Sequence, residues 1–97
     1  MKNAQQLEIL FDALRNDRRI RTVHISLYMA FFFLLSLKDF QNPISITRRE
    51  IMQISKIGGY ATYHKCIKDL QKYGYIQYYP SYHPAFGSLV YLNIFKN

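Results

Sequence analysis

The chain has 97 residues and a formal net charge of +7, from thirteen Lys and Arg against six Asp and Glu. This length predicts one domain and excludes an enzyme built of several domains. Hydrophobic residues make up 49% and charged residues 20%, with nine Tyr and seven Phe, a mixture typical of globular chains rather than disordered ones. The positive charge suits either a polyanionic partner or a merely basic surface, and composition does not choose between them.

The cysteine content and the one long apolar run indicate a cytoplasmic protein without a membrane segment. Cys66 is the one cysteine, so no internal disulfide forms, and the polar residues before position 23 do not have the pattern of a signal peptide. The apolar run at 23–37 has 15 residues, whereas a bilayer needs about 20. We therefore expect a buried helix there, a reducing cytoplasm around the protein and no contact with a membrane.

Two helices are predicted in the N-terminal half of the chain. Residues 3–16 have apolar side chains at positions i, i+3, i+4 and i+7, which are Leu7, Leu10, Phe11 and Leu14. This helix is expected either to cover the core of its own domain or to form a dimer interface. Thr22 is a candidate N-cap for a second helix, apolar on all sides, that runs to about Lys38, and Asn42-Pro43 then begins a connector.

Two more helices are predicted from residue 47 on. Thr47 and Glu50 have the spacing of a capping box, and Gly58-Gly59 is expected to end this helix with a positive φ. The next helix is expected from about Tyr60 to Tyr73. Its inward stripe is predicted to consist of Tyr63, Ile67 and Leu70, and Cys66 is expected to lie beside them.

The C-terminal part has the period-two pattern of β-strands. Residues 75–79 and 88–94 alternate between apolar and polar, and the turn-rich segment 80–87 joins them into a β-hairpin with a long tip. The expected fold class is therefore α+β and mainly α. The single domain divides into an N-terminal helix (1–20), a three-helix core (21–74) and the hairpin (75–95).

A resemblance to a known family rests on the second half of the chain. The segment Thr62-Tyr63-His64-Lys65-Cys66-Ile67-Lys68-Asp69-Leu70, followed by Gly74-Tyr75-Ile76, resembles the recognition-helix pattern of bacterial winged helix-turn-helix regulators. The resemblance covers residues 45–94. It implies a winged helix-turn-helix domain with an extra N-terminal helix and with the β-hairpin as its wing. Tyr63 departs from the family, which has a small aliphatic residue at this position.

A second resemblance concerns the whole chain. It rests on the segments Arg21-Thr22-Val23-His24-Ile25-Ser26-Leu27-Tyr28, Ile46-Thr47-Arg48-Arg49-Glu50 and Gly87-Ser88-Leu89-Val90-Tyr91-Leu92. These are similar to small winged-helix proteins encoded on transposons and related mobile elements of Bacteroidetes-type bacteria. Such proteins are regulators or accessory factors of mobilisation and excision. The resemblance implies double-stranded DNA as the partner and a place at the bacterial nucleoid.

The excess positive charge is concentrated in residues 45–73, which hold six Lys and Arg against Glu50 and Asp69. A helix of this domain would enter the DNA major groove, where each base pair presents its own pattern of donors and acceptors. Base contacts are expected from the outward residues of the helix at 60–73, which are Tyr60, Ala61, Thr62, His64 and Lys65. Phosphate contacts are expected from the start of the preceding helix and the far end of this one, namely Thr47, Arg48, Arg49, Lys68 and Lys72.

The hairpin departs from the family because residues 73–95 carry no charged side chain, so the arginine that many wings place in the minor groove is missing. The candidate contacts of the wing are Ser81, Tyr82, His83 and Phe86. Three roles stay open for them, which are hydroxyl groups that bond phosphates, an apolar tip that unstacks bases or packs on sugars, and a surface for another protein. His83 is expected to add positive charge below neutral pH, as an unperturbed histidine does.

Two functions compete, and neither is catalytic. The first is sequence-specific binding of double-stranded DNA, as a transcriptional regulator or an accessory factor of recombination and excision, with a homodimer through the N-terminal helix as one option. The second is a protein-interaction module whose tyrosine-rich wing holds a recombinase or a replication protein. No enzyme is expected, because no nucleophile with a base and no phosphate loop can be assembled. No cofactor or metal is expected, because the candidate ligands lack ligand spacing: His24, His64, His83 and Cys66.

Overall fold

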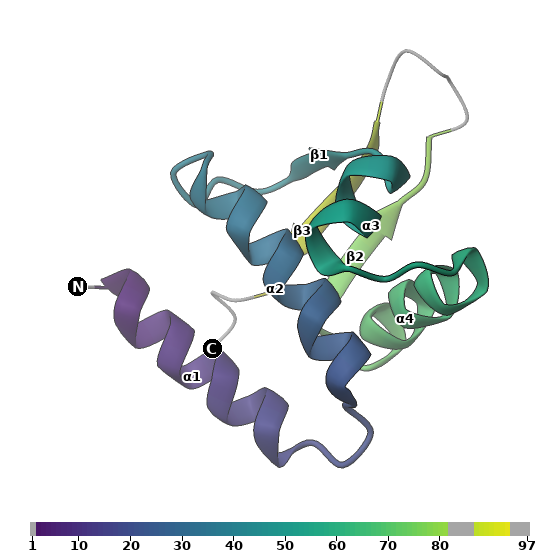
Figure 1. The fold of residues 1–97 in the computed structure, drawn as a ribbon. Coiled ribbons are helices and arrows are strands. Elements are labelled where there is room, and N and C mark those ends of the chain that lie inside the picture. The colour runs from purple at the N-terminus through teal and green to yellow at the C-terminus, as the bar shows by residue number, and fades with distance from the viewer. Residues whose placement is uncertain (1, 82–86, 94–97) are drawn as a thin grey trace.

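The structure is a computed structural model that describes residues 2–81 and 87–93, with side chains from residue 4 on. In chain order its elements are α1 (Lys2–Asn16), α2 (Thr22–Ser36), β1 (Ile44–Ile46), α3 (Arg48–Ser55), α4 (Tyr60–Lys72), β2 (Ile76–Tyr79) and β3 (Ser88–Leu92), as Figure 1 shows. The described residues thus form four helices and one three-stranded antiparallel sheet. The prediction of a mainly helical α+β fold is confirmed.

The sheet has the strand order β1-β3-β2, so its first strand pairs with its last. The sequence does not predict strand β1, since residues 44–46 follow directly on the expected connector. Its three residues alternate buried, exposed, buried, and it lies antiparallel to β3 with Ile44 opposite Val90. The side chain of Asn42 continues this ladder, because it donates to the carbonyl of Leu92 and accepts from the Leu92 N–H, each at 2.9 Å.

Helix α2 forms the centre of the core, with α1 on one side of it and the α3–α4 pair on the other (Figure 1). Its residues Leu27, Tyr28, Phe31 and Leu35 are fully buried. The helix is apolar on nearly all sides, which is the pattern of a segment that is covered by other elements. The expectation of a buried central helix is therefore confirmed, although α2 ends at Ser36 rather than near Lys38.

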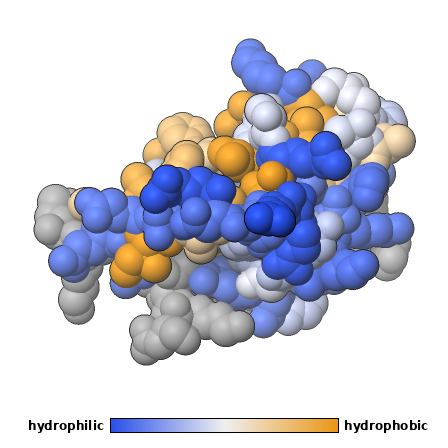
Figure 2. Space-filling model, turned by 90° about the horizontal axis from the view of Figure 1, so that it is seen from below, coloured by the Kyte–Doolittle hydropathy of each residue, from blue (hydrophilic) through white to orange (hydrophobic). Residues whose placement is uncertain are grey.

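Helix α1 covers the core with two of its four predicted apolar residues. Leu10 and Leu14 are buried and Leu7 is partly buried, whereas Phe11 is exposed. Ile9 is exposed too. At 100° per residue, Ile9 and Phe11 flank the buried stripe on opposite sides. In Figure 2, which views the molecule from below, hydrophilic residues cover most of the visible face, with apolar ones between them. A dimer through α1 stays a prediction.

The ends of two helices differ from expectation. Arg21, not Thr22, is the N-cap of α2, and its backbone N–H donates to Nδ1 of His24 at 2.9 Å. Helix α3 ends at Ser55, and the residue that turns left-handed there is Lys56, with φ of 65°. Gly58-Gly59 therefore does not supply the positive φ. The chain must leave the helix directly after its last turn, and the two glycines come too late for that.

The predicted inward stripe of α4 is confirmed. Tyr63, Cys66, Ile67 and Leu70 are all buried against the core. Burial raises the pKa of Tyr63 to about 12 and also raises the pKa of the Cys66 thiol. Cys66 is therefore a small core residue, as expected, because a buried thiol with a raised pKa is a poor nucleophile.

Tyr28 of α2 carries the one buried hydroxyl group in the described residues that has no hydrogen-bond partner. Its ring is fully buried and packs edge-on against Tyr75, with the ring centroids 6.1 Å apart. Burial raises the pKa of Tyr28 far above its ordinary value, so the group stays protonated. A buried polar group without a partner costs about 1–3 kcal/mol of stability.

Tyr28→Phe is therefore expected to raise the free energy of unfolding by about 1 kcal/mol, because it removes the unpaired hydroxyl and keeps the ring. Tyr75→Phe is the matched control. It removes the bond from the Tyr75 hydroxyl to Asp17, 2.7 Å long, and should lower the free energy of unfolding by a similar amount. Urea denaturation of both variants measures the two effects. A loss of stability in Tyr28→Phe would contradict the assignment.

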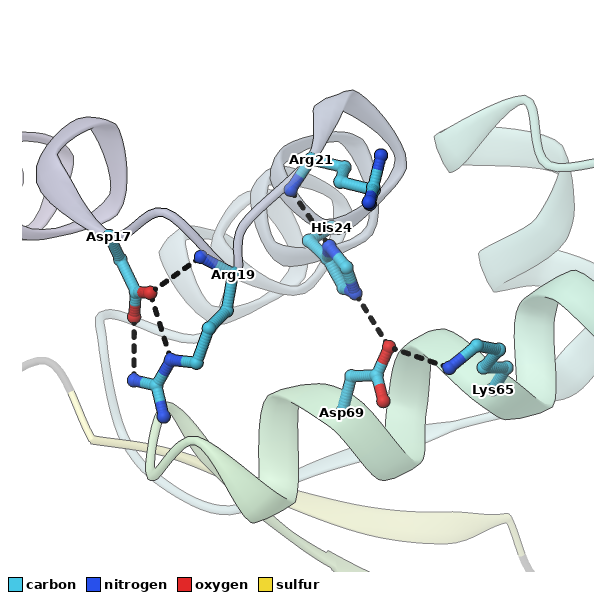
Figure 3. Close-up of polar contacts among 6 residues, drawn as sticks. All are labelled: Asp17, Arg19, Arg21, His24, Lys65 and Asp69. Atoms are coloured by element: carbon cyan, nitrogen blue, oxygen red, sulfur yellow. Dashed lines mark hydrogen bonds and ion pairs between the residues drawn. The ribbon is translucent and has the colours of Figure 1, made fainter.

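Asp17 fastens the loop between α1 and α2 to the rest of the molecule. Its carboxylate accepts from Arg19 Nε at 2.9 Å and from Arg19 Nη2 at 2.8 Å, as Figure 3 shows. It also accepts from the Tyr75 hydroxyl. The guanidinium of Arg19 also lies 4.2 Å from the centroid of the Tyr73 ring. These hydrogen bonds hold the pKa of Asp17 well below its usual range, and the bonds from Arg19 have a larger effect than the bond from Tyr75.

This depressed pKa predicts how stability depends on acid. The stabilisation is fully present above the pKa of an unfolded Asp, about 3.9, and is lost as the pH falls towards the lower folded value. Asp17→Asn should therefore be less stable than the wild type at pH 7, and its melting temperature should fall less steeply between pH 4 and 2. Melting curves at several pH values measure both. An equal acid slope in the two proteins would refute the role of Asp17.

Candidate nucleic-acid interface

The start of α3 presents two arginines and free backbone donors. Thr47 is the N-cap of α3, and its hydroxyl accepts from the Glu50 N–H at 3.2 Å, which is one of the two bonds of the predicted capping box. Arg48 and Arg49 follow in the first turn and are exposed. The first N–H groups of a helix lack partners within the helix, so a helix start that also carries cations attracts anions. All three residues that were predicted for phosphate contact here lie at the surface.

The connection between α3 and α4 is short, and a buried residue and two hydrogen bonds hold it in place. Ile57 is buried, and its N–H donates to the hydroxyl of Ser55 at 3.4 Å. The Ser26 hydroxyl of α2 bonds to the Ser55 carbonyl, which ties this end of α3 to the central helix. Gly59 is then the N-cap of α4 and has no side chain that could cap. The first turn of α4 is thereby left open to solvent.

Helix α4 exposes all seven of its residues that were predicted to contact DNA, which are Tyr60, Ala61, Thr62, His64, Lys65, Lys68 and Lys72. They do not form one cluster. At 100° per residue the middle of the exposed arc is occupied by Ala61, Lys65, Lys68 and Lys72, with Tyr60 and His64 on one flank and Thr62 on the other.

A groove of about 1230 Å³ runs along the flank of Tyr60 and His64. Its walls come from the end of β1, the start of α3, the start of α4 and the base of the hairpin. Six predicted site residues meet there, namely Thr47, Arg48, Arg49, Tyr60, His64 and Ser81. Other lining residues were not predicted, including Met52, Gln53, Tyr63, Tyr78 and Ser88. No spacing in the sequence connects the hairpin with α3, so this part of the groove had no signal.

Arg48 and Tyr60 join the two helices across the groove. The guanidinium of Arg48 lies 4.2 Å from the centroid of the Tyr60 ring, a cation–π distance. One face of the Tyr60 ring is therefore covered by α3, although the residue as a whole is 61% exposed. The contact holds Arg48 beside the start of α4, where the predicted phosphate and base contacts adjoin.

On the other flank, a polar chain links α4 to α2. His24 Nε2 lies 2.9 Å from Asp69 Oδ2, and Lys65 Nζ lies 3.5 Å from the same oxygen (Figure 3). The pair Lys65 and Asp69 has the i, i+4 spacing that a helix brings together, so it could have been predicted. The contact with His24 spans 45 residues and has no local signal.

The hairpin has a neutral outer face. Tyr79, Leu89 and Tyr91 are exposed there, and the rings of Tyr79 and Tyr91 meet edge-on with centroids 6.2 Å apart. Ser81 lies at the base of the tip, where its N–H donates to the Ser88 hydroxyl at 3.2 Å. The other predicted wing contacts lie outside the described residues, and they are Tyr82, His83 and Phe86.

Within residues 2–81 and 87–93, no three His, Cys, Asp or Glu side chains gather in a way that could hold a metal ion. None of the helices in that part of the chain has the length and hydropathy needed to cross a bilayer. Comparisons with models of protein families, with curated proteins and with solved structures give no match. A function therefore has to be argued from the site itself.

Proposed function

We propose that the chain is a winged helix-turn-helix protein that binds double-stranded DNA at specific sequences and has no catalytic activity. Its role would be that of a transcriptional regulator, or of an accessory factor in the recombination or excision of a mobile element. The observation that best supports this proposal is the position of three elements around a single groove. The start of α3, the Tyr60 and His64 flank of α4 and the base of the hairpin line one groove, and the exposed Arg48 and Arg49 are among its lining residues.

The order of the elements supports the same proposal. A short connection joins helices α3 and α4, and a hairpin follows whose second strand, β3, also pairs with the earlier strand β1. This layout is the one expected of a winged helix. In such a domain the second helix, here α4, lies in the major groove. Lys65 and the polar residues near the start of α4 then read base edges. Arg48 and Arg49, together with Lys68 and Lys72, neutralise phosphates.

Selection of bound sequences from random duplex DNA tests this function. We expect a short motif to be enriched, since α4 offers several donors to the base edges. An inverted repeat with half-sites about one helical turn apart would indicate a dimer, whereas a single half-site would indicate a monomer. If repeated rounds enriched no motif, sequence-specific binding would be refuted.

A second candidate function rests on the outer face of the hairpin. Tyr79, Leu89 and Tyr91 form an exposed and uncharged surface there, and tyrosine is enriched at protein interfaces. The wing would then hold a recombinase or a replication protein. The double variant Tyr79→Ser with Tyr91→Ser separates the candidates, because it should keep full affinity for DNA and lose the protein partner if the second is right.

A further inference from the structure

Asp69 is the acidic residue that α4 carries next to its exposed cations. Its carboxylate is mostly buried, with 15% of the side chain exposed, whereas Lys65 is 77% exposed. Both the His24 ring and the Lys65 ammonium group approach the same oxygen, Oδ2. Among the residues that the structure describes, Lys65 is the one lysine of α4 with an ion pair, and Lys68 and Lys72 have none.

The position of the Asp69 carboxylate is fixed from α2. The Arg21 N–H donates to His24 Nδ1 at 2.9 Å, so Nδ1 carries a lone pair and the ring hydrogen lies on Nε2. Nε2 therefore donates to Asp69, and this bond needs no charge on the buried imidazole. The hydrogen bond from His24 is the main reason why the pKa of Asp69 lies below its usual range. Burial acts in the opposite direction, and the charge of Lys65 lowers the pKa further. Asp69 is thus a fixed negative charge at neutral pH.

We infer that Asp69 is a positioning residue that holds Lys65 on the α2 flank of α4 and competes with DNA for the Lys65 ammonium group. This role rests on the DNA binding proposed above. An ion pair whose lysine is exposed is weak, so a DNA site with well-placed acceptors displaces Asp69, whereas a loosely held phosphate does not. The consequence is discrimination, because Lys65 adds more to binding at the specific site than to binding elsewhere.

Asp69→Asn tests the inference, since the amide oxygen of asparagine still accepts from His24 Nε2 while the charge is lost. The measurement is fluorescence anisotropy with the selected duplex and with a scrambled one, at several salt concentrations. For the scrambled duplex we expect affinity to rise about threefold at 0.1 M salt, as for the release of an exposed pair. The plot of log affinity against log salt should steepen by about 0.9, the value for one added phosphate contact. The preference for the selected duplex should fall.

Two controls separate this role from a general effect of charge. Asp12→Asn removes a carboxylate from an exposed pair on α1 with the same change in net charge, and it should leave binding unchanged. Lys65→Ala with Asp69→Asn should bind no better than Lys65→Ala alone. A gain that persists without Lys65 would overturn the inference, because Asp69 would then act on DNA directly.

A further comparison uses two exposed lysines, and in the wild-type background it leaves the bond between His24 and Asp69 intact. Lys65→Ala should weaken binding to the scrambled duplex less than Lys68→Ala does, because Lys65 is already paired. In the Asp69→Asn background the two losses should become equal. If the wild type binds DNA with a steep salt dependence and Asp69→Asn changes nothing, the inference fails and the proposed function stands. If the wild type shows no salt-dependent binding, both fail.

Discussion

Replacing both Arg48 and Arg49 with glutamine is expected to weaken binding to duplex DNA of every sequence, by about a hundredfold or more near physiological salt, because each lost bond to a charged group costs about 1.5–3 kcal/mol. Both side chains are exposed at the start of α3 and line the groove. Phosphate contacts carry no sequence information, so the selected and scrambled duplexes should lose affinity alike. Titrations by fluorescence anisotropy measure both losses.

The matched control is Arg15→Gln with Arg18→Gln. These two arginines lie on α1 and in the loop after it, they are exposed, and their replacement changes the net charge by the same amount. We expect a loss of less than about threefold, since exposed charges farther away than a Debye length of about 8 Å are screened. Equal losses in the two double variants would mean that total charge, and not the α3–α4 surface, drives binding.

Gly87→Ala is expected to destabilise the protein by about 2 kcal/mol, within the usual range for overpacking. A Cβ atom on Gly87 would lie 2.5 Å from the Ile46 carbonyl oxygen and 2.7 Å from Ser45 Oγ. The backbone of Ile46 cannot move away from residue 87 without breaking the pairing of Ile46 with Ser88. The melting temperature should fall by roughly 10 °C, at about 4–8 °C per kcal/mol for a domain of this size.

Gly58→Ala is the control for this substitution. A Cβ atom on Gly58 would meet no heavy atom within 4 Å, and the residue does not adopt a positive φ. Alanine there should leave the melting temperature unchanged or raise it slightly, because it restricts the unfolded chain. A wild-type melting temperature for Gly87→Ala would show that β1 and β3 do not pack as closely as described.

The helices could be predicted because their signals are local. Apolar spacing placed the stripe of α4, and the pair Thr47 and Glu50 located the start of α3. Strand β1 could not be predicted, because three residues are too few for a periodic pattern and its partner lies more than 40 residues away. The left-handed Lys56 was missed because two glycines nearby offered a stronger signal.

The candidate site could be predicted as a set of exposed residues but not as an arrangement. Helical spacing identified which residues of α4 face outward. The division of that face into two flanks depends on what packs beside it, the hairpin on one flank and α2 on the other. The contact of His24 with Asp69 and the stack of Arg48 on Tyr60 join separate elements, so they follow from the tertiary fold.

The central claim is that the cationic surface of α3 and α4 binds DNA, and the dependence of affinity on salt tests it most directly. Affinity for a duplex should be measured between about 50 and 200 mM salt, the range in which phosphate contacts are strongly screened. Log affinity should fall linearly with log salt, and Arg48→Gln should reduce the steepness by about 0.9, the value for one phosphate contact. A flat response, or a slope that Arg48→Gln leaves unchanged, would contradict the account.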